Sequence, residues 1–521
     1  MTEHVDVRAS GLDVVEAANA AQSTYDLTAD AVVIGSGAGG AIAAYELAKT
    51  GKKVIVLEAG RYVPSQKMTE MSAVSLGTMY ADSAGQANAQ GDITILQGAC
   101  VGGSTVVNAA LCFRTPDFYF KLWGERFGLT NLTTVSMTPY FEKVEKNIWI
   151  TPNEDWETSP GAELIKEGLV ATETPIGIAK RNVKDCALTG FCFAGCKTER
   201  KQSMLVTYLP WAQAHGTEIY ADTRVNTITS KDGVANGVTA EMINPDTKEK
   251  VADITVSAPI VVLAAGPIQS PIILMKSGLA NSSGQVGQNF ACHPSLSLTA
   301  EFDTPVDDFT GATHSVYVDE YTLPDENGVG GFILLNAIEQ PVFAGASQNP
   351  GTGKPYISMM EKFANTIRLI TLLHDKNSGN VTYKDGVKTI NYTVDDEDFE
   401  AMKDGLKVNA RILMAAGAVR VYIPTTLAKV IESEDQIDTV IDSLKNEKSR
   451  YPYTSFHPQG TLRMGADPAT TVVSPMGETH DVKNLYVVDA SLLPTSIGYN
   501  PSETVFALAS YISDQINAAH E

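Results

Sequence analysis

The apolar positions of this 521-residue chain predict both buried strands and helices. The stretch from residue 31 to residue 60 reads AVVIGSGAGGAIAAYELAKTGKKVIVLEAG, with one apolar run at its start and a second that ends at Glu58. Continuous apolar runs of this length are typical of strands that are buried on both faces of a parallel sheet. Because a glycine-rich turn and a helical segment lie between the runs, the stretch predicts strand, turn, helix and strand. Residues 260–266 predict another buried strand, which closes on Gly266.

Later segments carry different patterns. Residues 218–230 and 236–243 alternate apolar and polar side chains, which predicts a pair of half-buried strands. Between residues 300 and 450, strand-like runs alternate with helices, including a helix expected over 397–417. Residues 485–516 again predict a strand, a loop and a helix.

This order of elements predicts an α/β protein with two domains, and the chain is too long for one ordinary core. Pieces of a Rossmann-like nucleotide-binding domain occur at the start, middle and end, and an α+β substrate domain with an antiparallel sheet is inserted between them. A polar, partly helical leader is expected before the first strand. The expected boundaries are 1–28 for the leader, 29–125, 216–299 and 455–521 for the nucleotide-binding domain, and 126–215 and 300–454 for the substrate domain.

The net charge of the chain excludes some classes of binding partner. The net charge of -22 argues against nucleic acid and anionic membranes, because both require clustered Lys and Arg. No apolar run approaches the roughly 20 residues that span a bilayer, and the first residues do not resemble a signal peptide. We therefore expect a cytoplasmic protein without a membrane span.

The glycine-rich turn carries the first candidate chemistry. Gly35, Gly37 and Gly40 form a G-x-G-x-x-G pattern between a predicted strand and a predicted helix. The glycines allow a tight turn, close approach of a pyrophosphate, and close packing of helix on strand, while the helix N-terminus favours phosphate. Glu58 lies at the spacing of an acid that binds ribose hydroxyls, and it would repel the 2′-phosphate of NADP. The turn itself leaves NAD and FAD open.

Four further stretches resemble the glucose–methanol–choline (GMC) family of FAD oxidoreductases, in the family's order and over nearly the whole chain. They comprise residues 98–116, 261–274, 284–294, and 455–465 together with 485–509. The resemblance implies that the cofactor is FAD and that the discontinuous domain binds it. The region 300–450 matches the family only loosely.

The resemblance also implies where FAD is bound. Gly102, Gly103 and Ser104 would bring a loop close to the flavin ring, with Asn108 near its reactive edge; the alternative is a tight buried turn. Val225 lies where the family's backbone meets the adenine. Three residues near the C-terminus would approach the flavin: Asp489 near the ribityl and pyrophosphate groups, and Pro501 and Thr504 beside the pyrimidine. For Asp489 the alternative is a helix or turn cap.

The catalytic pair implied by the resemblance is His457, in SFHPQGTLRMG, and Asn500, in GYNPSE. A neutral imidazole can accept a hydroxyl proton, and an amide can donate a hydrogen bond to the alkoxide that forms. The carbon-bound hydrogen would leave as hydride to flavin N5. His293 is interpreted as structural, and Glu503 as a less favoured base.

Cys186, Cys192 and Cys196 have the spacing C-x5-C-x3-C. The segment around them resembles long-chain alcohol oxidases, and the spacing also resembles bacterial FAD glucose dehydrogenases whose cysteines hold an iron–sulfur cluster. Three interpretations stay open: a disulfide or buried thiols, iron–sulfur ligands, or a zinc site that needs a fourth ligand.

These patterns predict an FAD-dependent alcohol oxidase or dehydrogenase that passes electrons to dioxygen or another acceptor. Apolar runs at 331–338 and 357–363 favour a hydrophobic alcohol as the small-molecule substrate. Two alternatives remain: an iron–sulfur-containing dehydrogenase for sugars or polyols, and a non-redox lyase that retains FAD.

Overall fold

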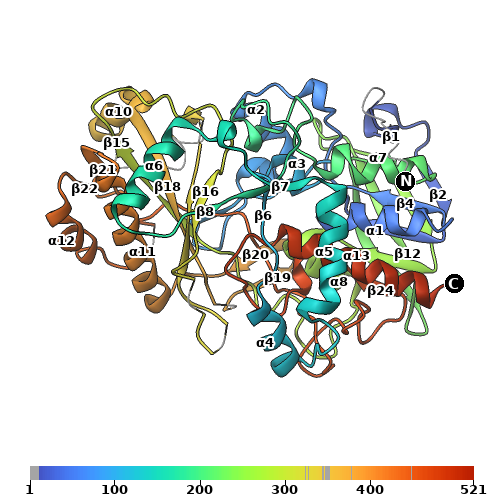
Figure 1. The fold of residues 1–521 in the computed structure, drawn as a ribbon. Helices are drawn as coiled ribbons and strands as arrows, with labels where there is room; N and C mark the ends of the chain where they lie inside the picture. The colour runs from blue at the N-terminus through green and yellow to red at the C-terminus, as the bar shows by residue number, and fades with distance from the viewer. Residues whose placement is uncertain are drawn as a thin grey trace.

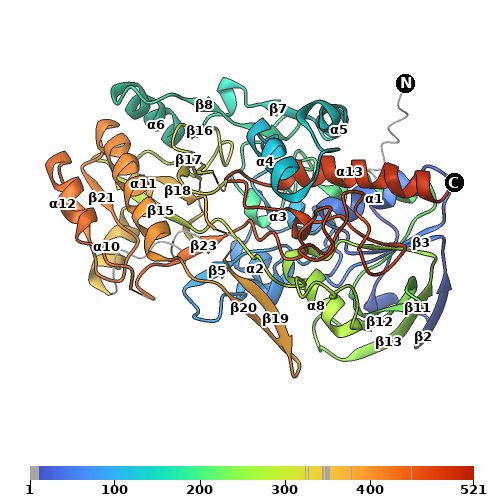
Figure 2. The same cartoon turned by 90° about the horizontal axis from the view of Figure 1, so that it is seen from below.

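A computed structural model describes residues 11–521, except residues 323, 327, 339, 343, 344, 346–352, 377 and 448. A parallel sheet and a mainly antiparallel sheet lie towards opposite ends of the molecule (Figures 1 and 2). No helix in the described ranges combines the length and apolar character that a membrane span requires.

The parallel sheet draws its strands from the start, middle and end of the chain. Its order is β1 (Val14–Val15), β10 (Glu218–Tyr220), β4 (Val54–Leu57), β3 (Ala31–Ile34), β14 (Ile260–Leu263) and β24 (Leu485–Val487). Every residue of β3, β4 and β14 is buried, as their continuous apolar runs predict. Helix α1 (Ala38–Ala48) follows β3 and packs against α13 (Ser502–Ala519) (Figure 2). This arrangement confirms the discontinuous α/β fold.

A second sheet lies beside the parallel one. It has the order β11 (Thr223–Lys231), β12 (Val234–Ile243), β13 (Lys250–Ser257) and β2 (Thr24–Thr28). Strands β11 and β12 form the predicted half-buried pair, and β2 joins β13 in parallel.

The expectation of a partly helical leader is wrong for most of the described residues 11–28. They form β1, β2 and a short 3-10 helix, Ala17–Asn19, because each strand pairs with a distant one, β10 or β13. Residues 1–10 of that leader lie outside the described residues.

The antiparallel sheet has the order β22 (Val430–Ile431), β21 (Arg420–Tyr422), β15 (Ser295–Glu301), β18 (Thr366–Leu373), β17 (Phe332–Asn336), β16 (Val316–Val318) and β8 (Gly177–Ile178). Strand β23 (Tyr453–Ser455) pairs with β15 and, in parallel, with β5 (Ile93–Ile95). Helices α11 (Asp396–Ala415) and α6 (Pro160–Ala171) pack against this sheet and each other.

Shorter elements complete the fold. The helices are α2 (Ser72–Met79), α3 (Ser104–Val107), α4 (Asp117–Phe127), α5 (Thr134–Asn147), α7 (Tyr208–Ala214), α8 (Gly266–Ser277), α10 (Lys354–Glu361) and α12 (Ile437–Asp442). The strands are β6 (Leu111–Cys112), β7 (Ile150–Pro152), β9 (Lys180–Asn182), β19 (Asn380–Lys384) and β20 (Val387–Asn391). Helix α5 packs on α13 and α7 packs on α1. The boundaries of the two domains stay a prediction.

Candidate functional site

The glycine turn lies between β3 and the start of α1. Gly35 has a φ of +98°, and a Cβ added there would lie 2.4 Å from the carbonyl oxygen of Ala264. A Cβ added at Gly40 would lie 2.0 Å from the carbonyl oxygen of Gly35. In the described structure no side chain caps α1 at Gly37. The N-terminal N–H groups of α1 are therefore suited to hold a phosphate.

Ser36 connects this turn to Glu58 and to the loop that starts at Gly102. Its hydroxyl donates to Oε2 of Glu58 over 2.7 Å and accepts the N–H of Gly102 over 2.9 Å. The N–H of Gly60 donates to Oε1 of Glu58 over 2.8 Å. Burial raises the pKa of Glu58, although these hydrogen bonds oppose the shift. The sequence interpretation missed Ser36, although it occupies the variable position inside G-x-G.

The loop of residues 102–108 is held by both backbone and side-chain contacts. The hydroxyl of Ser104 accepts the N–H of Gly98 over 3.0 Å, and Oδ1 of Asn108 accepts the N–H of Ala110 over 3.1 Å. The buried ammonium of Lys201 donates to the carbonyl oxygen of Asn108 over 2.6 Å. Lys201 is a further residue that the sequence interpretation missed.

The two glycine segments touch. A Cβ added at Gly103 would lie 2.7 Å from Cα of Gly37. The donor set here comprises the uncapped N-terminus of α1, the buried carboxylate of Glu58 and a surface of bare backbone. These groups fit the pyrophosphate and ribose of a dinucleotide.

Val225 and Asp489 flank this region. The N–H of Thr223, two residues before Val225 on β11, donates to the carbonyl oxygen of Glu58 over 2.8 Å. Oδ2 of Asp489 accepts the N–H of Gly266 over 2.9 Å and the hydroxyl of Ser270 over 2.6 Å. Asp489 therefore caps the start of α8, which matches the alternative that its sequence context left open.

Pro501 and Thr504 lie at the start of α13. Pro501 is the N-cap of this helix. The hydroxyl of Thr504 lies 2.8 Å from that of Thr115. These contacts place the beginning of α13 against the segment that follows the 102–108 loop.

His457 and Asn500 are in direct contact. His457 follows β23, Asn500 precedes α13, and Nε2 of His457 lies 2.9 Å from Nδ2 of Asn500. Both side chains are only partly buried. Burial lowers the pKa of His457 to about 3, and His314 adds to the shift. The imidazole is therefore neutral at pH 7.

A second histidine lies behind His457. Nδ1 of His293 is 3.3 Å from Nδ1 of His457, and Nε2 of His293 is 2.9 Å from the hydroxyl of Ser496. The carboxylate of Asp375 accepts a hydrogen bond from the backbone N–H of His293 over 3.0 Å. It also accepts one from the hydroxyl of Ser496 over 3.3 Å. The sequence interpretation missed the link from His457 to Asp375, although His293 lies in the motif 284–294.

The sequence neighbours of the pair, Phe456 and Tyr499, make aromatic contacts. Phe456 stacks on Phe193 with ring centroids 5.8 Å apart, and Phe113 lies 5.2 Å from Tyr499. Phe113 and Tyr499 pack against an apolar cluster formed by Leu111, Ala179, Ile333, Leu335 and Leu372. The run 331–338 thus contributes Ile333 and Leu335 beside the site, whereas Ile357 in the run 357–363 is exposed.

The three clustered cysteines lie close to the basic side chains of Arg181 and Lys201. Cys186, Cys192 and Cys196 are free thiols, and within the described ranges no three His, Cys, Asp or Glu side chains are grouped to hold a metal ion. Nη2 of Arg181 donates to Sγ of Cys192 over 3.6 Å, and the N–H of Lys201 donates to Sγ of Cys196 over 3.3 Å. Although burial opposes the shift, Arg181 and Lys201 lower the pKa of Cys192. The cysteines are therefore free thiols that lie near the charged side chains of Arg181 and Lys201. The interpretation of these cysteines as metal ligands gains no support.

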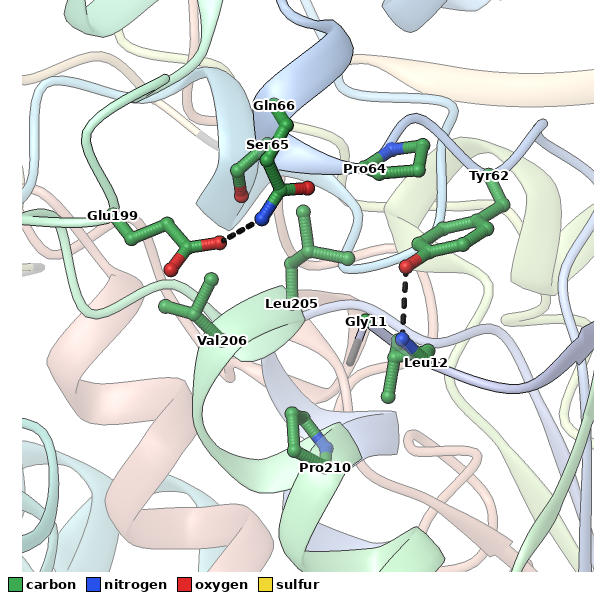
Figure 3. A pocket seen from close by; sticks show the side chains of 10 residues that line it. All are labelled: Gly11, Leu12, Tyr62, Pro64, Ser65, Gln66, Glu199, Leu205, Val206 and Pro210. Atoms are coloured by element: carbon green, nitrogen blue, oxygen red, sulfur yellow. Dashed lines mark hydrogen bonds between the residues drawn. The ribbon is translucent and has the colours of Figure 1, made fainter. Parts of the chain in front are cut away.

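A separate small cavity has Leu205 and Pro210 in its lining (Figure 3). Its volume is about 30 Å³, and Leu12, Tyr62, Gln66 and Glu199 are among the residues that line it. The hydroxyl of Tyr62 accepts the N–H of Leu12 over 2.9 Å. This volume suits a water molecule, and none of the predicted site residues lines the cavity.

Comparison with known proteins gives matches along most of the chain. The N-terminal model of the GMC oxidoreductases matches residues 29–295, and the C-terminal model matches residues 375–509. A long-chain-alcohol oxidase of Arabidopsis thaliana is 29% identical over 514 residues, which cover 92% of this chain and 67% of that protein. An uncharacterised GMC-type oxidoreductase of Mycobacterium tuberculosis is also 29% identical, covering 94% of this chain and 75% of its own length.

Solved structures share the fold at lower identity. Pyridoxine 4-oxidase from Mesorbium loti aligns with a TM-score of 0.69 at 17% identity, covering 94% of this chain and 100% of its own. Formate oxidase from Aspergillus oryzae RIB40 aligns with a TM-score of 0.68 at 17% identity, covering 95% and 99%.

Proposed function

The chain belongs to the GMC oxidoreductase family, and from that membership we propose that it is an FAD-dependent enzyme that oxidises an alcohol to an aldehyde or ketone. The observation that carries the proposal is the 2.9 Å contact between Nε2 of His457 and Nδ2 of Asn500. The two groups are partly accessible and lie in motifs that resemble those of the family.

FAD supplies a flavin that accepts hydride at N5. Support for FAD comes from the glycine cradle at the start of α1 and from the names of solved relatives, one of which is an FAD-dependent oxidoreductase from Chaetomium thermophilum. The residues that would hold it are Gly35, Gly37, Gly40, Glu58, Gly102, Gly103, Ser104, Asn108, Val225, Asp489, Pro501 and Thr504.

His457 is the proposed base. If Nδ2 of Asn500 donates to Nε2 of His457, this nitrogen carries a lone pair and no proton, and an entering hydroxyl would take the place of the amide as the donor to it. A hydroxyl placed between the two groups would give its proton to His457 and accept a hydrogen bond from the amide. Oδ1 of Asn500 is buried and has no partner among the described residues, so a bound ligand could satisfy it.

We propose a hydrophobic alcohol as substrate. Support comes from the apolar cluster beside Tyr499 and from the likeness to long-chain-alcohol oxidases. Dioxygen or another acceptor would take the electrons, and oxygen consumption measured with and without an artificial acceptor separates the two.

Anaerobic reduction of the flavin tests the proposal. A long-chain primary alcohol should bleach the flavin absorbance of the purified holoenzyme. His457→Ala should retain the flavin and lose about 10²- to 10⁴-fold in the rate of bleaching, because a general base typically supplies this factor. His215→Ala, an exposed histidine, is the matched control. A fully active His457→Ala variant would refute the role of the base, and turnover without any flavin reduction would indicate a lyase.

A further inference from the structure

We propose that Lys201 and Arg181 are positioning residues that hold the peptide group between Asn108 and Ala109 so that its N–H faces the flavin, and that they make the flavin easier to reduce. The inference rests on the proposed binding of FAD. It gives a role to two buried cations that the proposed oxidation leaves unexplained.

Lys201 and Arg181 are fully buried cations without a carboxylate partner. Their exposed fractions are 2% and 1%, and neither forms an ion pair within the part of the chain that the structure describes. Burying a charge without a counter-ion is costly, and two like charges near each other add to the cost. Negative charge that is bound nearby would offset this cost.

Both cations bind the backbone of the loop that is expected to contact the flavin. The ammonium of Lys201 donates to the carbonyl oxygen of Asn108 over 2.6 Å and to that of Cys192 over 2.9 Å. Nε of Arg181 donates to the carbonyl oxygen of Ala109 over 3.4 Å, and its Nη2 donates to Sγ of Cys192 over 3.6 Å. Two successive peptide oxygens of the loop are therefore turned toward the cations.

The peptide group between Asn108 and Ala109 has one free end. A trans peptide is planar, so its C=O and N–H point in opposite directions, and the described chain contains no cis peptide. Because the oxygen faces Lys201, the N–H of Ala109 points away from it. This N–H has no hydrogen-bond partner among the described residues, although Ala109 is only 7% exposed. Since unpaired buried N–H groups are rare, a bound acceptor is the expected partner.

The backbone beside this peptide is held in an uncommon conformation. Ala110 has a φ of +65°, which a residue with a side chain rarely adopts. Its N–H donates to Oδ1 of Asn108 over 3.1 Å, and its carbonyl oxygen accepts the N–H of Asn182 over 3.1 Å. Asn182 belongs to β9, as does Arg181, so this strand and Lys201 together fix the loop. Backbone held in this way clusters at functional sites.

This arrangement suits a flavin. The family resemblance puts Asn108 near the reactive edge of the ring, whose oxygen and nitrogen atoms can accept a hydrogen bond. Hydride brings negative charge onto the ring, and an N–H donor that is already in place stabilises this charge. The ammonium of Lys201 polarises the peptide from its oxygen end, which strengthens the N–H as a donor. The positive charges of Lys201 and Arg181 act in the same direction.

Potentiometric titration of the purified holoenzyme tests the role of the charge. Lys201→Met removes the ammonium and should lower the equilibrium constant for two-electron reduction of the flavin by about 10- to 100-fold, the usual effect of a hydrogen bond to a charged group. This change corresponds to about 30 to 60 mV in midpoint potential. Lys201→Gln keeps a neutral donor and should have a smaller effect. Lys403→Met, which replaces a buried lysine of α11 that is paired with Glu400, is the matched control and should resemble the parent.

The flavin content and thermal unfolding of each variant show whether the fold is retained. A merely structural role of Lys201 would lower stability and leave the potential of the flavin-loaded protein unchanged. A flavin-loaded Lys201→Met variant within about 10 mV of the parent, a factor of about two, would therefore overturn the inference and leave the proposed function intact. A parent protein that binds no flavin would refute the proposed function itself.

The orientation of the peptide is tested on the parent protein. Labelling with ¹³C at asparagine carbonyls and ¹⁵N at alanine selects the Asn–Ala peptides in NMR spectra, and Ala109→Gly identifies the signal of this peptide by its loss. The Ala109 amide signal should move when dithionite reduces the bound flavin, because its N–H faces the ring. An unchanged signal would overturn the inference even if no Lys201 variant retains its flavin.

Discussion

Replacing Ser36 with alanine should loosen the contact between the glycine turn and the 102–108 loop. Ser36 is fully buried, its hydroxyl donates to Glu58 over 2.7 Å, and it accepts the N–H of Gly102 over 2.9 Å. The substitution removes a hydrogen bond to a buried carboxyl group and leaves a backbone N–H without a partner. Together these losses should lower the free energy of unfolding by about 3 to 5 kcal/mol.

The matched control is Ser510→Ala. Ser510 is also fully buried, but its hydroxyl has no hydrogen-bond partner among the described residues, so its removal should be nearly neutral or stabilising. Urea unfolding followed by tryptophan fluorescence, with and without added FAD, measures both variants against the parent. Ser36→Ala should also bind FAD about 10-fold more weakly or worse, since ~1.4 kcal/mol corresponds to a factor of ten. A Ser36→Ala variant within about 0.5 kcal/mol of Ser510→Ala would refute this reasoning.

Two other predictions concern groups outside the catalytic pair. Burial, followed by the neighbouring Glu145, raises the pKa of Glu503 to about 8, so the folded protein loses stability as the pH rises from about 4.5 through 8. Glu503→Gln should lack this loss and be more stable than the parent at pH 8.5 by roughly 5 kcal/mol in urea unfolding; equal pH profiles would contradict the assignment. The cation-paired cysteines should hold no iron, so elemental analysis and EPR of holoenzyme purified without oxygen should show none, and Cys192→Ser should keep its flavin. About three irons per chain would restore the cluster interpretation.

The parallel sheet could be predicted because its central strands are recognisable from their own sequences. Buried on both faces, β3, β4 and β14 are continuous apolar runs, and the glycine turn marks the passage from strand to helix. The short strands β1 and β2 carry no such signal. Their pairing with β10 and β13, far along the chain, overrides the local preference from which the leader was interpreted as partly helical.

The residues of the candidate site also fall into those that the sequence predicts and those that it does not. His457 and Asn500 could be found because each lies in a motif that resembles the family, and the structure places them in contact. The partners of His293 could not, because Ser496 lies 203 residues away in sequence and Asp375 lies 82 away. For the cysteines, the C-x5-C-x3-C spacing gives only their separation in sequence. It does not show where the thiols point, because their contacts are with Arg181 and Lys201, which lie outside residues 186–196.

The proposed catalytic pair, His457 and Asn500, also joins the two main sheets of the molecule. His457 follows β23, which pairs with β15 and β5 of the antiparallel sheet. Asn500 precedes α13, which packs on α1 beside the parallel sheet. Since one member comes from each side, their 2.9 Å contact depends on how the two sheets are held relative to each other. His293 strengthens this connection, because it leads into β15 while its ring contacts Ser496 and the N–H of Gly498 in the loop before Asn500. The contacts of His293 with His457, Ser496 and Gly498 therefore help to fix the position of the proposed base.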